Sequence, residues 1–401
     1  MSTKHSNAQQ VNLRVMELLD LVPGPPIGDY KKYTVKWPDG TLRWLFSIRG
    51  FNPGYMAFQA KMTLRGYAFL YAALATRYLY EGLPFGISAY YVRPSETGLL
   101  YRCIVNTRAD DWDVFFGTPG IKRNVVAALL RKGQVIGYLK VPLKVPETAD
   151  SCSLPIYFNC EYDAYKYIAS LDLNNIVIPK VLKIERAVLT TSLNGRVIES
   201  RDSNILGAGL AEIYNTSLSR SSLGGYLTKK SICNRIDSIQ IKKPRDSALN
   251  MGDLERICSS LRSRIARFDL DSEMAMCLSL VDFTPWNAMV IKGKLGVIDV
   301  EFCEPNVSAG YDLIHYVIQP WMMSNKSHTA ADFKELIEAK VRARLFCIYG
   351  IEEAKAATYL DLYVIQNTLR SLEIYSDQVV LHRQAIMQIE FWRELNEIWF
   401  L

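Results

Sequence analysis

The hydrophobic pattern of the chain changes near its middle, from strand-like in the first half to helix-like in the second. Residues 33–48 alternate apolar and polar positions around an Asp-Gly pair, which favours a β-hairpin. Residues 112–141 hold three apolar runs separated by turn residues and predict an antiparallel meander. From about residue 204, apolar residues recur every three or four positions, as in 251–268 and 330–401, and predict helices. Strands followed by helices indicate the α+β class.

The first hundred residues predict a small appendage made of a hairpin and a helix. A loose lead-in covers residues 1–29, and helical spacing runs from about 55 to 80. The most apolar stretch, 66–86, carries Arg77 and Glu81, so it is too interrupted to cross a membrane. We expect this stretch to be a buried helix.

Composition narrows the class of protein. The chain has 401 residues, of which 49% are apolar and 22% charged, as in a soluble globular protein. Its net charge of +6 is spread along the chain; it suits an anionic ligand but does not predict a nucleic-acid partner. The eight cysteines include no C-x-x-C pair, so a zinc site is not expected. Because Met1–Gln10 is polar and lacks a signal-peptide pattern, we expect free cysteines and a cytoplasmic protein.

Candidate chemistry is concentrated in residues 278–302 (LSLVDFTPWNAMVIKGKLGVIDVEF). Asp282 and Asn287 break the apolar pattern at D-x-x-x-x-N spacing, and Asp299 ends the last apolar run, with Glu301 two residues later. Carboxylate and amide oxygens are ligands that Mg²⁺ prefers, and a further carboxylate can orient a hydroxyl and accept its proton. Singly, each residue reads as a turn or strand-end residue; their joint spacing favours a site for phosphoryl transfer.

Four further residues point to nucleotide binding when their order along the chain is considered. Gly117 and Gly120 form a G-x-x-G turn between two predicted strands, which allows backbone to approach a phosphate. Lys140 lies on the third strand of the meander, and Glu161 begins a stretch with helical spacing. A strand lysine braced by a helix glutamate can hold nucleotide phosphates, although each residue alone would be an ordinary surface residue.

In this order the chain resembles the aminoglycoside phosphotransferase and choline kinase family, small-molecule kinases with a protein-kinase-like fold. The segments VDFTPWNAMV, GKLGVIDVEF and AGYDLIHYV are similar to the family signature; GTPGIKRN, YLKV and CEYDAYKYI match its N-terminal lobe more loosely. The resemblance covers roughly residues 110–400. It implies a bilobal fold with an appendage at 1–105, an antiparallel-sheet N-lobe at 106–193 and a mostly helical C-lobe at 194–401.

The resemblance also implies roles for individual residues. Asp282 would be the catalytic base, and Asn287 and Asp299 would be the metal ligands for Mg²⁺. Asp312, in GYDLIHY, would support the catalytic loop.

For ATP, the resemblance implies that Gly117 and Gly120 belong to a phosphate-covering loop. Lys140 would contact the α- and β-phosphates, braced by Glu161. The nucleotide hinge would follow the strand RAVLTTS, near 190–193, and would include Thr191 and Leu193.

The chain departs from the family pattern at one point: Leu280 and Val281 stand where the family usually has His-Gly. An ATP- and Mg²⁺-dependent kinase acting on a hydroxyl of a small molecule, most plausibly a sugar or glycan intermediate, fits the residues best. Aromatic residues that could stack on a sugar, or else belong to the core, are Trp286, Tyr311, Tyr316 and Trp321.

A pseudokinase is the first alternative, motivated by Leu280 and the appendage. A protein kinase is the second, although no Phe-Gly follows Asp299 and no A-P-E follows later. His315 lies in an apolar helical stretch and is expected to be a packed core residue. The sequence leaves the acceptor, the choice of ATP over GTP, and the oligomeric state open.

Overall fold

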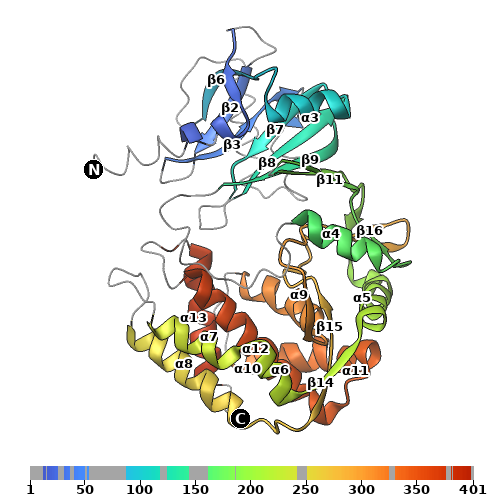
Figure 1. The fold of residues 1–401 in the computed structure, drawn as a ribbon, viewed down its shortest axis with the longest axis vertical. Helices are drawn as coiled ribbons and strands as arrows, with labels where there is room; N and C mark the ends of the chain where they lie inside the picture. Colours follow the sequence, from blue (N-terminus) through green and yellow to red (C-terminus); the bar gives the residue numbers. More distant parts are fainter. Residues whose placement is uncertain are drawn as a thin grey trace. The chain divides into compact units, whose positions relative to one another are not determined.

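The residues described by the computed structural model are 12–14, 16–25, 31–36, 40–49, 52–53, 87–117, 124–143, 161–185, 187–241, 251–324, 330–375, 381 and 383–398. Contacts group the chain into two units, Met1–Glu147 with Pro179–Leu193, and Thr148–Ile178 with Asn194–Leu401. Figure 1 shows the strand-rich first unit and the helix-rich second unit. The α+β class and the division into an antiparallel-sheet part and a mostly helical part are thereby confirmed.

The first unit is built on one mixed-length antiparallel sheet. Its strands, in the spatial order β1-β6-β2-β3-β7-β8-β9-β12-β11, are Leu21–Pro23, Ile87–Pro94, Lys31–Lys36, Leu42–Phe46, Asp111–Phe115, Asn124–Arg131, Gln134–Pro142, Ala187–Thr191 and Val181–Ile184. Pairing of β2 with β3 confirms the predicted hairpin, and pairing of β7 with β8 and of β8 with β9 confirms the predicted meander. A short pair, β4 (Ile48–Arg49) with β5 (Asn52–Pro53), lies outside this sheet. The predicted helix at 55–80 lies outside the described residues.

The N-terminal strands are part of the same sheet as the meander. Strand β3 pairs with β7 through Trp44 opposite Phe115 and Leu45 opposite Val114. Strands on both sides of residue 105 therefore share one sheet, while the three-part division that the sequence suggested stays a prediction.

A buried lysine joins these strands. The side chain of Lys32 on β2 is only 2% exposed, and its Nζ lies 2.7 Å from Asp111 Oδ1 and donates to Ser47 Oγ at 2.6 Å. Asp113, fully buried on β7, accepts the backbone N–H of Ser47 at 2.6 Å. Buried charges are tolerated where they are paired and hydrogen-bonded, as they are here.

One helix of the first unit, α3 (Leu99–Thr107), packs against β8 and β9. Its first residue is capped from a distance, because Leu99 N donates to Asp20 Oδ2 at 2.9 Å. Leu100 and Cys103 face the sheet and are fully buried in a core that also contains Leu139 and Val141 of β9. The neighbours of Lys140 are thus buried, as its strand assignment predicted.

The second unit contains two small sheets. Their strands are, in spatial order, β10 (Ile176–Val177), β17 (Lys294–Val297), β16 (Ala288–Ile291) and β13 (Arg196–Val197) in one, and β14 (Ser219–Ser222), β15 (Glu273–Ser279) and β18 (Glu304–Ser308) in the other. Lys292 and Gly293 connect β16 to β17 with φ of 49° and 78°, the left-handed conformation that a two-residue hairpin turn requires. This turn confirms the predicted one.

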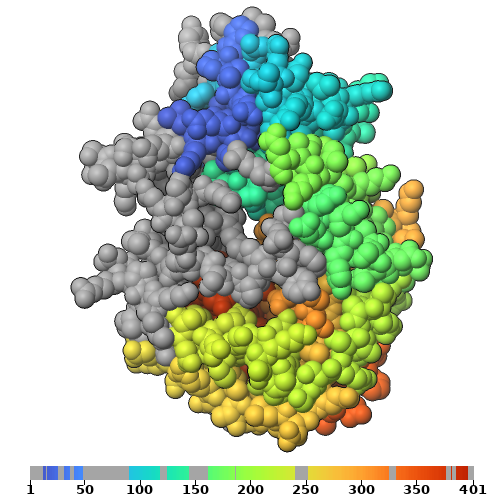
Figure 2. Space-filling model, in the orientation of Figure 1, coloured from blue at the N-terminus to red at the C-terminus, as the bar shows by residue number. Residues whose placement is uncertain are grey.

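The described α-helices of the second unit are α4 (Glu161–Ser170), α5 (Ser203–Ser217), α6 (Leu223–Lys229), α7 (Ile232–Ile241), α8 (Met251–Ile265), α9 (Tyr311–Met322), α10 (Ala330–Ile337), α11 (Ala343–Tyr349), α12 (Glu353–Tyr375) and α13 (Arg383–Ile398). A short 3₁₀-helix, η4 (Ser200–Asp202), and a short π-helix, η5 (Glu338–Arg342), accompany them. Helix α12 packs against α7, α9 and α13. In Figure 2, α6, α7 and α8 (yellow-green to yellow) cover one face of this unit. Within the described part of the chain, no helix is long and apolar enough to span a membrane.

Helix α9 begins at a position that only glycine fits comfortably. Gly310 has φ of 83°, and a Cβ there would lie 2.4 Å from Leu345 Cδ2. Just before it, Ala309 N donates to Ala275 O at 3.0 Å and ties the helix start to β15. This arrangement places Asp312, in the first turn of α9, beside the end of β15.

Candidate functional site

Asp282 and Asn287 lie together in the loop between β15 and β16. Asn287 Nδ2 donates to the backbone oxygen of Asp282 at 2.9 Å and lies 3.2 Å from its Oδ2. Asn287 is buried, whereas the Asp282 side chain is 36% exposed. The five-residue spacing therefore brings the two side chains into contact, with the carboxylate reaching solvent.

The loop is anchored by Asp312. Its Oδ1 accepts from Ser279 Oγ at 2.6 Å and from Val281 N at 3.0 Å, and its Oδ2 accepts from Leu280 N at 2.9 Å. Burial raises the pKa of Asp312, and these three hydrogen bonds act in the opposite direction. Asp312 thus supports the loop that holds Asp282, as expected, while the catalytic role of that loop stays a prediction.

These bonds also pair the backbone around Leu280, which stands where the family that the sequence resembles usually has histidine. Leu280 is 2% exposed and fills apolar space, while its backbone N–H and that of Val281 both find an acceptor in Asp312. Val281 has φ of 65°, a strained conformation for a β-branched residue. The anchoring bonds hold this strained turn immediately before Asp282.

Asp299 is held next to this loop and to α4. The preceding Ile298 donates its N–H to Asn287 O at 3.0 Å, and Asp299 N lies 3.0 Å from Tyr165 Oη on α4. Asp299 itself has φ of 60°. The left-handed turn that follows β17 thus directs the chain toward α4, which begins at Glu161.

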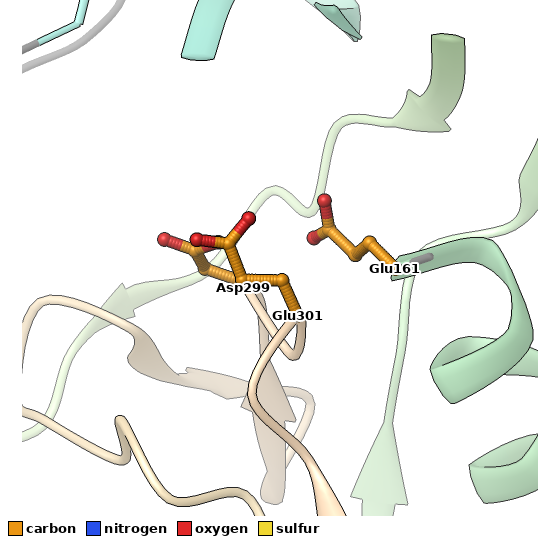
Figure 3. A group of neighbouring side chains, drawn as sticks. All are labelled: Glu161, Asp299 and Glu301. Carbon is orange, nitrogen blue, oxygen red and sulfur yellow. The ribbon is translucent and has the colours of Figure 1, made fainter. Parts of the chain in front are cut away.

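Three carboxylates meet at this point. Oxygen atoms of Glu161, Asp299 and Glu301 lie within 4.8 Å of one another. Figure 3 shows Glu161 extending from the first turn of α4 toward the two acids on the segment after β17. Glu161 is buried, and Asp299 and Glu301 are partly exposed. Glu301 stands two residues after Asp299 in the sequence, but the sequence pattern predicted no role for it.

This donor set suits a hard divalent cation. Two unit charges 4.8 Å apart repel by about 3.5 kcal/mol at an effective dielectric constant near 20. A cation between the carboxylates attracts each of them and makes the net interaction energy favourable. Because Asn287 Nδ2 faces Asp282, the amide oxygen of Asn287 is its remaining ligand atom. The residues present therefore fit Mg²⁺.

The nucleotide residues expected in the first unit are described in part. Gly117 follows β7 with φ of 66°, and Gly120 lies outside the described residues. Lys140 is on β9, partly buried, as expected. It belongs to the first unit and Glu161 to the second, so their ion pair stays a prediction.

The predicted hinge coincides with a unit boundary. Thr191, at the end of β12, donates its N–H to Lys180 O at 2.9 Å and is exposed. Leu193 is the last residue of the first unit before the chain enters the second. The nucleotide roles of both residues stay predictions.

His315 has a contact that its sequence context did not reveal. Its side chain is 7% exposed, which agrees with the expected buried position, yet its Nε2 lies 3.5 Å from Asp282 Oδ1. The only signal in the sequence is its place three residues after Asp312, on the helix face that also reaches the loop.

The four aromatic residues proposed for acceptor binding differ in exposure. Trp286, in the loop between β15 and β16, is 52% exposed, whereas Tyr311 is 3% exposed and belongs to the core. Tyr316 packs on Phe283 at a ring distance of 5.4 Å. Trp321 packs against other rings of α10 and α13. Trp286 is thus the ring of the four with the most surface available to a ligand.

Solved structures with detectable similarity include several small-molecule kinases. They include an amicoumacin kinase in complex with AMP-PNP, Ca²⁺ and Ami (TM-score 0.46, 16% identity, 72% of this chain and 88% of that chain), and the aminoglycoside phosphotransferase APH(2″)-IIa with streptomycin and ATP (TM-score 0.44, 15% identity, 69% and 90%). An ethanolamine kinase from Plasmodium vivax has a TM-score of 0.44 at 12% identity and covers 73% of this chain and 83% of that chain. No protein-family model matches the sequence, and no curated protein matches it.

Proposed function

We propose that this protein is an ATP- and Mg²⁺-dependent phosphotransferase that transfers the γ-phosphate to a hydroxyl group of a small molecule. The observation that carries the proposal is the pairing of Asp282 with Asn287 in one anchored loop, beside the carboxylates of Asp299, Glu301 and Glu161. Phosphoryl transfer depends mainly on positioned charges and a positioned hydroxyl, and this loop provides rigid positions for both.

Asp282 is the general base in this proposal. Its carboxylate is partly exposed, so an acceptor hydroxyl can reach it, and the contact with Asn287 Nδ2 restricts its rotation. A base in this position orients the hydroxyl and takes its proton, a contribution of roughly 10²- to 10⁴-fold in rate.

Asn287 and Asp299 would hold Mg²⁺, and Glu161 and Glu301, whose carboxylate oxygens lie within 4.8 Å of that of Asp299, would take part directly or through water. When bound, Mg²⁺ supplies positive charge that screens the nucleotide phosphates. Tyr165 holds the backbone of Asp299, which fixes the point from which its carboxylate extends.

The nucleotide would be bound from the first unit. Gly117 and Gly120 would cover the phosphates with backbone N–H groups, Lys140 would contact the α- and β-phosphates, and Thr191 and Leu193 would contact the base. The strand position of Lys140, between buried Leu139 and Val141, supports this role because it fixes the side-chain direction.

The acceptor is proposed to be a sugar or a glycan intermediate. The exposed ring of Trp286 lies four residues after Asp282 and one before Asn287, so it sits in the loop that would hold the hydroxyl. An exposed aromatic face can pack on the apolar face of a sugar ring. Trp286→Ala should raise KM for the acceptor with little change in KM for ATP.

The proposal is tested by a screen for phosphorylated products. The purified protein is incubated with Mg²⁺-ATP and separate pools of sugars, aminoglycosides, choline-like alcohols and nucleosides, and products are detected by mass. Asp282→Asn should bind Mg²⁺-ATP but transfer roughly 10²- to 10⁴-fold more slowly, and Asp299→Ala should lose metal-supported ATP binding. The exposed Asp271, in the turn before β15, provides a matched control as Asp271→Asn.

The outcomes separate the competing functions. Full activity in Asp282→Asn removes that residue from the base role, and unchanged Mg²⁺-ATP affinity in Asp299→Ala removes the metal assignment. Mg²⁺-ATP binding without transfer or hydrolysis would favour the pseudokinase, and phosphorylation of peptides in preference to small molecules would favour a protein kinase.

A further inference from the structure

His315 occupies a buried position at the centre of a polar cluster on the inner side of the catalytic loop. Its Nδ1 lies 3.0 Å from Asn367 Nδ2 and 3.1 Å from Tyr363 Oη. Both partners come from α12 and are buried. On the opposite side of the ring, Nε2 lies 3.5 Å from Asp282 Oδ1.

The cluster determines which ring nitrogen carries the proton. An amide NH₂ can only donate, so a hydrogen on His315 Nδ1 would face a second donor, Asn367 Nδ2, 3.0 Å away. Asn367 Nδ2 also reaches the hydroxyls of Tyr311 and Tyr363. Tyr363 Oη can also donate to that nitrogen. Neutral His315 therefore carries its hydrogen on Nε2, and this hydrogen faces the carboxylate of Asp282.

Within the described residues, His315 Nε2 has no hydrogen-bond partner, and Asp282 is the acceptor that it approaches. It is buried and makes no hydrogen bond there that meets usual geometry, and a buried donor left without an acceptor costs about 1–3 kcal/mol. Catalytic hydrogen bonds are often long in the absence of substrate and shorten when it binds. A 3.5 Å approach to Asp282 fits that description.

We propose that His315 is a positioning residue for Asp282: its Nε2–H holds Oδ1, while Asn287 Nδ2 holds Oδ2, so that the carboxylate presents its free lone pairs to the acceptor. The inference rests on the proposed phosphotransfer, since it assigns a role toward the base of that reaction. With both oxygens held, the side chain has one orientation in place of several, which reduces the entropy lost when the hydroxyl is aligned.

Kinetics of two variants test this role. His315→Leu removes the donor and should lower kcat by up to about 10²-fold, the cost of misplacing a reacting group by roughly 1 Å, while leaving KM for ATP unchanged. His315→Gln retains an N–H near the Nε2 position and should keep most of the activity. A leucine variant with full kcat, or a glutamine variant as slow as the leucine variant, overturns the proposal.

A packing control separates positioning from stability. Ile318 is fully buried on the same helix, one turn beyond His315, and its aliphatic side chain cannot donate a hydrogen bond to Asp282. Ile318→Ala should lower the unfolding temperature and leave kcat per folded molecule unchanged. Equal loss of kcat in this variant would show that α9 packing alone explains the effect of His315.

A spectroscopic measurement tests the contact without any turnover. The chain has four histidines, so ¹⁵N-histidine labelling gives few signals, and His315→Gln assigns the one of interest. The wild-type protein should show the Nε2–H tautomer, and Asp282→Ala should shift the Nε2 resonance. An Nδ1–H tautomer, or no response to Asp282→Ala, overturns the proposal.

The two tests also distinguish this inference from the proposed function. A protein that transfers no phosphate but shows the expected tautomer and shift would refute the function and keep the contact. A protein that transfers phosphate with unaltered kcat in His315→Leu would keep the function and refute the positioning role.

Discussion

Replacing Asp312 with asparagine tests whether the catalytic loop depends on one buried carboxylate. In the native protein both oxygens accept hydrogen bonds, two at Oδ1 and one at Oδ2. An asparagine keeps one acceptor oxygen. If the asparagine oxygen takes the place of Oδ1, the asparagine NH₂ group faces the N–H of Leu280, and two donors meet with no acceptor between them.

The magnitude follows from that geometry. One buried donor without a partner costs about 1–3 kcal/mol. The bonds at Oδ1 lose their charge assistance, but the cost of burying the carboxylate, visible in the raised pKa of Asp312, also disappears, and we treat these two effects as offsetting. The left-handed turn at Val281 stores strain of order 1–3 kcal/mol, equal in size to the lost anchoring, so the turn should relax and displace Asp282.

Denaturant unfolding and single-turnover transfer are the matched assays. Asp312→Asn should unfold with about 1–3 kcal/mol less free energy and transfer up to about 10²-fold more slowly. Asp361→Asn is the control, because Asp361 lies in the same unit and pairs with the buried Arg264 at 2.5 Å without contacting the loop. It should lose stability and keep its rate. Native stability together with a native rate in Asp312→Asn would refute the reasoning.

Three further predictions concern the loop and the electrostatics of the second unit. Val281→Gly should be more stable than Val281→Ala in denaturant titration, because φ of 65° favours glycine. This is the reverse of the usual order, in which glycine is about 0.5–1 kcal/mol less stable than alanine. A more stable alanine variant would show that no strain is stored at this position. Leu280→His should change single-turnover rates only modestly, since Asp312 already holds the backbone; robust activity gained by an otherwise inactive protein would instead support the pseudokinase. A hydrogen bond from Arg196 lowers the pKa of Asp202 from 3.8 to about 2. Ionised Asp202 therefore adds to the free energy of unfolding above pH 3.8, and this contribution is lost as the pH falls from 3.8 towards 2. Arg196→Gln should reduce this acid dependence of equilibrium unfolding, although the N–H of Glu199 still donates to Asp202, and an unchanged acid profile would contradict the assignment.

Local pattern was sufficient for the elements that carry the site. The alternation around β7, β8 and β9 predicted the meander, and the Lys-Gly turn after β16 placed Asp299 at the end of the next strand. D-x-x-x-x-N spacing brought Asp282 to Asn287 because a short loop leaves few other arrangements. These features depend on neighbours in the sequence, so the sequence contains the information directly.

The remainder depends on residues far apart in the chain. Lys32 lies on an alternating strand and would be expected at the surface, but its partner Asp111 is 79 positions away. His315 looked like core because its helix is apolar, and only the position of the loop against α9 and α12 reveals what its Nε2 faces. Pairing of β3 with β7, which merges the N-terminal strands with the meander, is likewise a tertiary contact that no local pattern specifies.

The hydrogen bond between Tyr165 and the backbone of Asp299 couples the position of α4 to the proposed metal site. The same helix carries Glu161, so one displacement of α4 would withdraw a carboxylate from the acidic trio and release the N–H of Asp299 together. Two states of that helix would then differ in cation affinity, and by thermodynamic reciprocity the cation would favour the state in which α4 is docked. A ligand that binds α4 would then change the cation affinity of the proposed phosphotransferase without contacting either of its substrates.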